Sequence, residues 1–208
     1  MKLKKSVKRK IVLIFIILLI ALLVFLYLKF YGTKEVTKSK VIDEIKEYGY
    51  TLKDTKNDEY KKEFKNLSKI LSEKKINEKE YAKSVSKLFI IDFYSLKDKL
   101  AKTDIGGEIF VHKDAKETFL EKAKDTIYKY VETNLYGNRT QKLPSVESVK
   151  INKIENISYE FGDNNGDDNA FQVSVSWSYK DNFDDNYQTK ATIIIVHEDK
   201  KLSIVELK

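Results

Sequence analysis

An uninterrupted apolar run near the N-terminus constrains this chain more than any other feature. Residues Ile11–Leu28 hold 18 consecutive positions without a charge, a glycine or a proline. At about 1.5 Å per residue, a helix over this run is roughly 27 Å long, close to the thickness of a bilayer core. A cleavable signal peptide usually has a shorter apolar region, of about 7–15 residues, followed by a small-x-small cleavage site. No such site follows the run, so the sequence predicts a retained signal anchor. Its transmembrane helix covers 11–30 and contacts membrane lipid through Ile11–Leu28.

Basic residues before the apolar run set its orientation. The first ten residues include six of them: Lys2, Lys4, Lys5, Lys8, Arg9 and Lys10. By the positive-inside rule, this flank stays in the cytoplasm. We therefore expect a single-pass protein of the plasma membrane, with a cytoplasmic basic tail over 1–10. A linker over 31–40 and an extracytoplasmic domain over 41–208 follow.

The net charge of +7 comes from the anchor region. The chain has 39 Lys and Arg residues and 32 Asp and Glu residues. Seven of the basic residues and none of the acidic ones lie in residues 1–29, which leaves 32 basic against 32 acidic side chains in the remainder. A nucleic-acid-binding domain concentrates positive charge on its folded part. The sequence therefore predicts no nucleic-acid partner.

The sequence lacks the common catalytic motifs. It has no cysteine, which excludes a Cys nucleophile and Cys-based zinc sites, and it has no P-loop or H-E-x-x-H pattern. The acidic segment that begins at Asp163 fails the EF-hand spacing, because its sixth position is Asp168 and not glycine. Of the two histidines, we expect His112 to cap a helix or to be exposed, and His197 to lie at an exposed strand end. We expect no enzyme activity, no cofactor and no metal; a pair of carboxylates from distant segments, as in glycosidases, stays open.

The spacing of apolar residues changes near Pro144. Before it, apolar residues recur mostly at helical spacing, and after it they alternate. We expect a short helical turn over 41–45, a short strand near 48–52, and helices over 57–71, 76–96 and 114–134. We expect strands over 146–161, 170–180, 186–198 and 201–207. The second strand has the clearest pattern, because its odd-numbered residues from Phe171 to Tyr179, including Trp177, are apolar and alternate with polar ones. This alternation predicts a strand with one face against a core.

Asp92 and the Gly106-Gly107 pair are the candidate site residues of the helical half. Asp92 lies inside an apolar helix end, where a carboxylate must be paired or hydrogen-bonded, or its pKa rises. It is either a site acid in a cleft or a structural partner to a neighbouring loop, and we favour the structural interpretation. Gly106-Gly107 predicts a tight loop, or a place where a partner backbone comes close.

The expected order is short helix, short strand, helices and a four-stranded antiparallel sheet, which is an α+β layout. With the N-terminal anchor, this order resembles the NTF2-like extracytoplasmic domains of VirB8/TcpC-type proteins over about residues 11–207. The segments "LFIIDFYSL" and "DIGGEIF" are also similar to uncharacterised membrane proteins of Gram-positive bacteria. The resemblance implies an NTF2-like domain, in which helices pack on the sheet. A composition rich in Lys, Ile, Asn and Tyr, with one Pro, predicts a bacterial source.

Two functions follow as expectations from this resemblance. The first is a protein-interaction or assembly module of a secretion, conjugation or envelope complex, with other envelope proteins as partners and a possible homo-oligomer. The second is an extracytoplasmic small-molecule-binding domain with a cavity between sheet and helices. The residues expected at such a cavity or interaction surface are Phe89, Asp92, Phe93, Gly106, Gly107, Trp177 and Tyr179.

Overall fold

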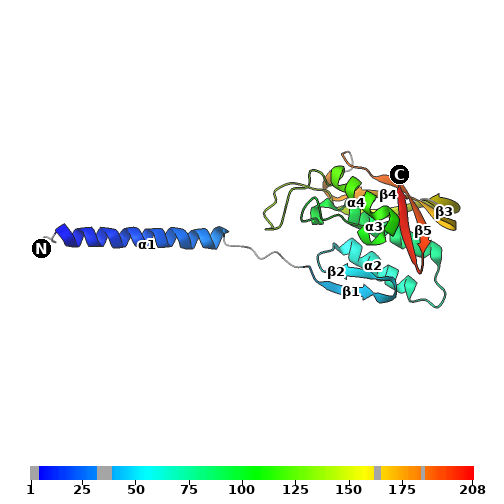
Figure 1. Cartoon of the computed structure of the whole chain (residues 1–208), viewed down its shortest axis with the longest axis horizontal. Helices are drawn as coiled ribbons and strands as arrows, with labels where there is room; N and C mark the ends of the chain where they lie inside the picture. The colour runs from blue at the N-terminus through cyan, green and yellow to red at the C-terminus, as the bar shows by residue number, and fades with distance from the viewer. Residues whose placement is uncertain (1–4, 32–38, 162–164, 184–185) are drawn as a thin grey trace. The chain divides into compact units, whose positions relative to one another are not determined.

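The chain forms two units, each described here by itself. The computed structural model describes residues 5–31, 39–161, 165–183 and 186–208. The first unit holds α1 (Lys5–Tyr31), a helix of 27 residues (Figure 1). Its segment Arg9–Tyr27 has a mean hydropathy of 3.1 and is long and apolar enough to cross a membrane. The expectation of an N-terminal helix of spanning length is confirmed to that extent.

The second unit, which runs from Lys38 to Lys208, begins with a two-stranded antiparallel ribbon. Strand β1 (Val41–Ile45) pairs with β2 (Tyr50–Lys53) through a 3-10 turn and Gly49, whose φ of 64° closes the hairpin. The expected helical turn over 41–45 is therefore wrong. Val41, Ile42 and Ile45 follow helical spacing, but the segment is too short for this spacing to determine its structure, and the pairing with β2 does so.

Three helices follow: α2 (Asp58–Leu71), α3 (Glu78–Tyr94) and α4 (Lys113–Asp125). The side chains of Asn57 and Asn77 cap α2 and α3, since each amide oxygen accepts a hydrogen bond from the backbone N–H three residues later. Helix α4 ends about nine residues before the expected end. The reason is Tyr128, which is fully buried and donates its hydroxyl hydrogen to the Phe93 carbonyl (2.6 Å), so the chain leaves the helix to place this ring.

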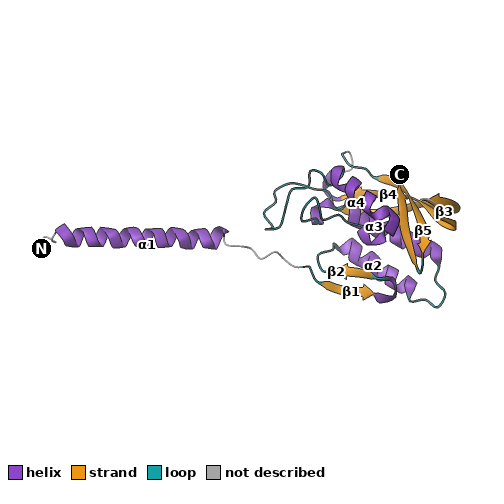
Figure 2. Cartoon of the chain, viewed as in Figure 1, coloured by secondary structure: helices purple, strands orange, loops and turns teal. Residues whose placement is uncertain are grey.

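The four expected strands form one antiparallel sheet in the order β3-β4-β5-β6. Figure 2 shows the strands in orange. They are β3 (Val146–Phe161), β4 (Asn165–Tyr179), β5 (Lys190–Glu198) and β6 (Lys201–Leu207). Helix α3 packs on this sheet against β3, β4 and β6. The odd-numbered residues of β4 from Phe171 to Tyr179 are buried beneath the helices, as the alternation predicts. The α+β class with helices on a four-stranded antiparallel sheet is thus confirmed.

The long β3–β4 hairpin curls over the second face of the sheet. The Tyr159 hydroxyl donates a hydrogen bond to the Glu206 carboxylate, although β3 and β6 are the two edges of the sheet. The Phe161 ring lies 5.1 Å from the ring of His112, at the start of α4. Register shifts in the β3–β4 pairing are the kind of irregularity that bends a strand pair. The curl explains why Ile194 is buried although it faces away from the helices.

Candidate functional site

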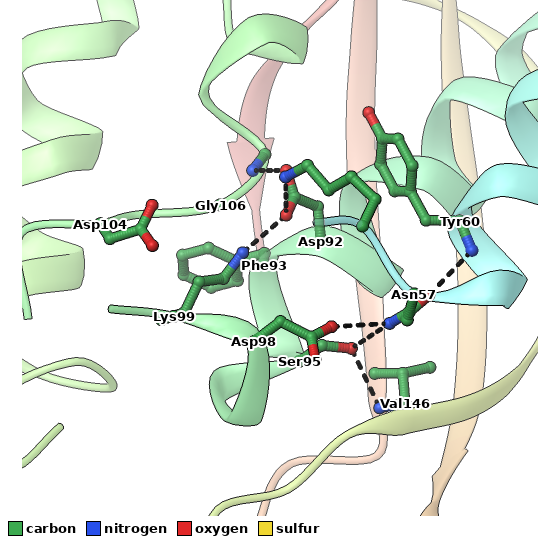
Figure 3. Close-up of polar contacts among 12 residues, drawn as sticks. Asn57, Tyr60, Asp92, Phe93, Ser95, Asp98, Lys99, Asp104, Gly106 and Val146 are labelled. Atoms are coloured by element: carbon green, nitrogen blue, oxygen red, sulfur yellow. Dashed lines mark hydrogen bonds and ion pairs between the residues drawn. The ribbon is translucent and has the colours of Figure 1, made fainter. Parts of the chain in front are cut away.

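Asp92 lies in the last turn of α3 and is 7% exposed. Its Oδ1 accepts hydrogen bonds from Nζ of Lys56 (2.5 Å) and Nζ of Lys99 (2.6 Å), and its Oδ2 accepts from the backbone N–H of Gly107 (2.9 Å) (Figure 3). Burial alone would raise the pKa of Asp92, but the ammonium groups of Lys99 and Lys56 outweigh it and hold the pKa well below its usual range. Asp92 is therefore ionised, and both of its carboxylate oxygens accept hydrogen bonds from the chain's own donors.

The two lysines of this cluster differ in burial. The Lys99 side chain is 4% exposed; burial would lower its pKa, but the charge of Asp92 raises it above the usual value. The Lys56 side chain is 21% exposed, and burial lowers its pKa despite the attraction of Asp92. The charged form of Lys99 thus depends on Asp92, whereas the Lys56 ammonium group also contacts water.

A second group of polar contacts joins the cluster to α2 and the sheet. The Asn57 amide donates to Oγ of Ser95 (3.2 Å) and to Oδ2 of Asp98 (3.0 Å), and the backbone N–H of Val146 donates to the same Ser95 hydroxyl (3.1 Å) (Figure 3). These bonds connect the start of α2, the end of α3 and the start of β3. The arrangement supports the structural interpretation of Asp92.

The Gly106-Gly107 loop lies against this cluster. A Cβ at Gly106 would overlap the Asp92 carbonyl and the Lys99 ammonium group, and a Cβ at Gly107 would lie 2.7 Å from the Phe89 ring. Gly107 also has a φ of 77°, which favours glycine. The backbone that approaches closely here is the chain's own, so the pair is explained as a tight loop over Asp92.

The expected site residues fall into two groups. The structure brings together Phe89, Asp92, Phe93, Gly106 and Gly107. Trp177 and Tyr179 lie on β4 instead, where the Trp177 ring packs 4.4 Å from Tyr94 and the Tyr179 hydroxyl donates to the Gln188 carbonyl (2.7 Å).

A separate cleft of about 520 Å³ lies between α4, the end of α3 and β6, and we call it the α4–β6 cleft. Asp92, Trp177 and Tyr179 are not among its lining residues. Apolar side chains form most of its walls, among them Phe89, Phe93, Phe119, Ile127, Ile204 and Leu207. The sequence predicted Phe89 and Phe93 as candidate site residues but not Phe119, because Phe119 lies beside the apolar residues Leu120, Ala123, Ile127 and Val131, which recur at helical spacing.

One border of the α4–β6 cleft is the free edge of β6. The backbone N–H of His112 donates to the Ile204 carbonyl (2.8 Å), and Val111 forms an isolated bridge with Ile204. Lys208, directly after β6, exchanges two backbone hydrogen bonds with Thr192 of β5. Because successive residues of a strand direct their backbone groups to opposite sides, the N–H and C=O of Leu207 point to the free edge.

Charged residues stand at the rim of the cleft. Nζ of Lys208 lies 2.8 Å from the Glu206 carboxylate, which lowers the pKa of Glu206. The hydrogen bond to Glu206 raises the pKa of Tyr159 to about 12. Lys122 also lines the cleft and makes no ion pair within the part of the chain that the structure describes.

The two histidines both contact the curled hairpin. His112 caps α4, since its Nδ1 accepts from the backbone N–H of Asp114 (3.2 Å), and it is buried; the expected cap is confirmed and the alternative of exposure is wrong. His197 is half-buried, with Nδ1 2.8 Å from the Asp167 carboxylate. This Asp167–His197 pair was not expected, because the two residues are 30 positions apart in the sequence and meet only in the folded sheet.

The ion cluster and the cleft therefore differ in what they can do. The oxygens of Asp92 are bound by the chain's own donors, whereas the α4–β6 cleft is open and apolar. In the described ranges, no group of three or more His, Asp or Glu side chains could hold a metal ion.

No family model, curated protein or solved structure matches the chain, so its function is inferred from this geometry.

Proposed function

We propose that this chain is a single-pass membrane protein whose extracytoplasmic domain is a protein-interaction module. In this proposal the α4–β6 cleft receives an apolar segment of another envelope protein. The observation that carries the proposal is an open apolar cleft bordered by the free edge of a strand. Peptide-binding domains combine these two features, because the edge supplies backbone hydrogen bonds and the cleft accepts side chains.

The anchor supports this function because it limits the distance of the domain from the membrane. Nine residues, 32–40, separate the end of α1 from β1. Fully extended, such a linker spans roughly 30 Å. The domain therefore stays near the membrane, which raises its effective concentration toward other membrane-bound proteins. The six basic residues before the apolar run support a cytoplasmic N-terminus and an outside domain.

We also propose the NTF2-like relationship of the domain. Helices on one face of a curled, four-stranded antiparallel sheet support it. In the VirB8/TcpC-type proteins that it resembles, such a domain is a non-enzymatic part of an assembly and is often oligomeric. A homo-oligomer is accordingly an expected outcome of the experiment below.

A second candidate function is the binding of one apolar small molecule in the same cleft. Its volume of about 520 Å³ favours this candidate, since ligand pockets typically measure about 300–1,000 Å³. The free edge of β6 favours a peptide over a small molecule, because a small apolar ligand would not use the backbone groups of Leu207.

Cross-linking in intact cells, followed by purification of the full-length protein and mass spectrometry, tests the proposal. We compare the wild type with Phe119→Ser, which changes the cleft wall, and with Tyr130→Ser. Tyr130 is 75% exposed and does not line the cleft, so it is a matched control. Thermal unfolding, followed by the single tryptophan, checks that both variants fold.

The proposal predicts that one reproducible set of envelope proteins is recovered with the wild type and Tyr130→Ser, and is lost with Phe119→Ser. Recovery of the same partners with folded Phe119→Ser would show that the cleft is not the binding site. Recovery of a lipid or another small molecule in place of proteins would favour the second candidate.

A further inference from the structure

We infer that the partner segment binds in an extended conformation along the free edge of β6 and presents a carboxylate to Lys122. This inference rests on the proposed function and states the kind of segment that the cleft accepts. Two independent features carry it: the backbone of β6 beside the cleft, and the charge of Lys122 at its rim.

The free edge of β6 is covered near its middle and open near its end. Val111 and His112 contact Ile204, whereas the backbone groups of Leu207 point outward beside the cleft. An unpaired strand edge is a template for another extended chain. A strand added at Leu207 would continue the sheet, and every second side chain would then face the helices. On that side lies Phe119, at the cleft wall.

Lys122 supplies the chemical selectivity. Two lysines, Lys122 and Lys208, line the cleft. Lys208 forms an ion pair with Glu206, whereas Lys122 forms none in the described ranges. An unpaired ammonium group beside an apolar wall favours a partner that brings a carboxylate to that position. The segment is therefore extended, with apolar side chains on one face and an Asp or Glu near the rim.

The test uses the full-length protein in the cells that make it. A photoreactive amino acid replaces Thr118 on α4 in one variant and Lys208 at the end of β6 in another; both positions line the cleft. Mass spectrometry of the adducts identifies the partner residues. We expect both positions to label one short segment that contains an Asp or Glu.

Charge reversal then tests Lys122. Lys122→Glu should reduce the yield of the Lys208 adduct by about fivefold or more. Lys124→Glu is the matched control, because Lys124 is exposed on the same helix and does not line the cleft. Exchange of the partner's mapped carboxylate for lysine should restore the adduct with Lys122→Glu.

Substitutions along the partner segment complete the test. Substitution of every second residue of the segment should abolish labelling, because alternate side chains of an extended chain face the same side. A dependence on every third or fourth residue, or a segment without a carboxylate, would overturn this inference and leave the proposed function standing. If neither position labels any protein, the proposed function itself fails.

Discussion

Nζ of Lys99 lies 2.6 Å from Oδ1 of Asp92, and both side chains are almost completely buried. A buried ammonium group is tolerated only with a counter-charge, and removal of one partner from a buried pair typically costs about 3–5 kcal/mol. We therefore expect Asp92→Asn to lower the free energy of unfolding by about 3–5 kcal/mol. Urea unfolding followed by Trp177 fluorescence measures this change, because Trp177 is the single tryptophan and is buried in the domain.

A double substitution separates the charge from the packing. In Asp92→Asn both Lys99 and Lys56 lose the carboxylate, while the new amide oxygen can still accept a hydrogen bond from Gly107. Adding Lys99→Met removes the more deeply buried of the two cations, and Lys56, which is 21% exposed, keeps its contact with water. The double variant should recover at least about 1 kcal/mol of the loss. Asp125→Asn, at an exposed position, is the control and should change stability by less than about 0.5 kcal/mol. Equal stability of Asp92→Asn and wild type would contradict the role given to this ion pair.

Gly106→Ala should be more damaging than its size suggests. The added Cβ would overlap the Asp92 carbonyl, which is backbone and cannot rotate away. Overpacking of this kind typically costs about 1–3 kcal/mol, and we expect the upper end of that range. Gly166→Ala is the matched control, because a Cβ there meets ordinary contacts at 3.7 Å. If both substitutions cost the same in urea unfolding, the loop does not lie tightly on Asp92.

Alkaline pH should destabilise the domain through its buried tyrosines. The hydroxyls of Tyr50 and Tyr81 lie 2.7 Å apart in the core. Burial raises the pKa of Tyr81 from 10.0 to about 12 and that of Tyr50 well above 10.0. The fold thus favours the neutral phenols: their contribution is complete below pH 10 and is lost as the pH rises through the folded-state values.

Unfolding free energies at pH 8, 10 and 11 measure this effect, together with tyrosinate absorbance. We expect stability to fall above about pH 10, and the absorbance of these two rings to appear with unfolding. Tyr81→Phe removes one of the titrating groups and should make the fall shallower. A steeper fall in that variant would contradict the assignment.

The strand half was predictable from sequence because its signal is local. Alternation from Phe171 to Tyr179 identifies a half-buried strand without any knowledge of its neighbours. The end of α4 was not predictable, since Tyr128 leaves the helical path to reach Phe93, a residue 35 positions earlier. The same holds for β1, because Val41, Ile42 and Ile45 follow helical spacing and only the pairing with β2 makes the segment a strand.

The candidate site was predictable only in its local part. Asp92 stood out because a charge inside an apolar helix end must find a partner, and it does find Lys99. The α4–β6 cleft could not be predicted, because its walls come from segments that lie far apart in the sequence and are brought together by tertiary packing. Phe119 and Leu207 each fit a local pattern, and nothing in the sequence indicates that they face one space.

The orientation of the anchor gives the last prediction. The chain has no cysteine, so a single introduced cysteine reports its own location without background. Ser6→Cys lies before the apolar run, and Tyr130→Cys lies at an exposed position of the domain. Because the basic flank favours a cytoplasmic N-terminus, a membrane-impermeant maleimide should label Tyr130→Cys in intact cells and leave Ser6→Cys unlabelled. Both variants should react after permeabilisation, which confirms that each thiol is accessible. Labelling of Ser6→Cys alone in intact cells would place the domain in the cytoplasm and remove envelope proteins as its partners.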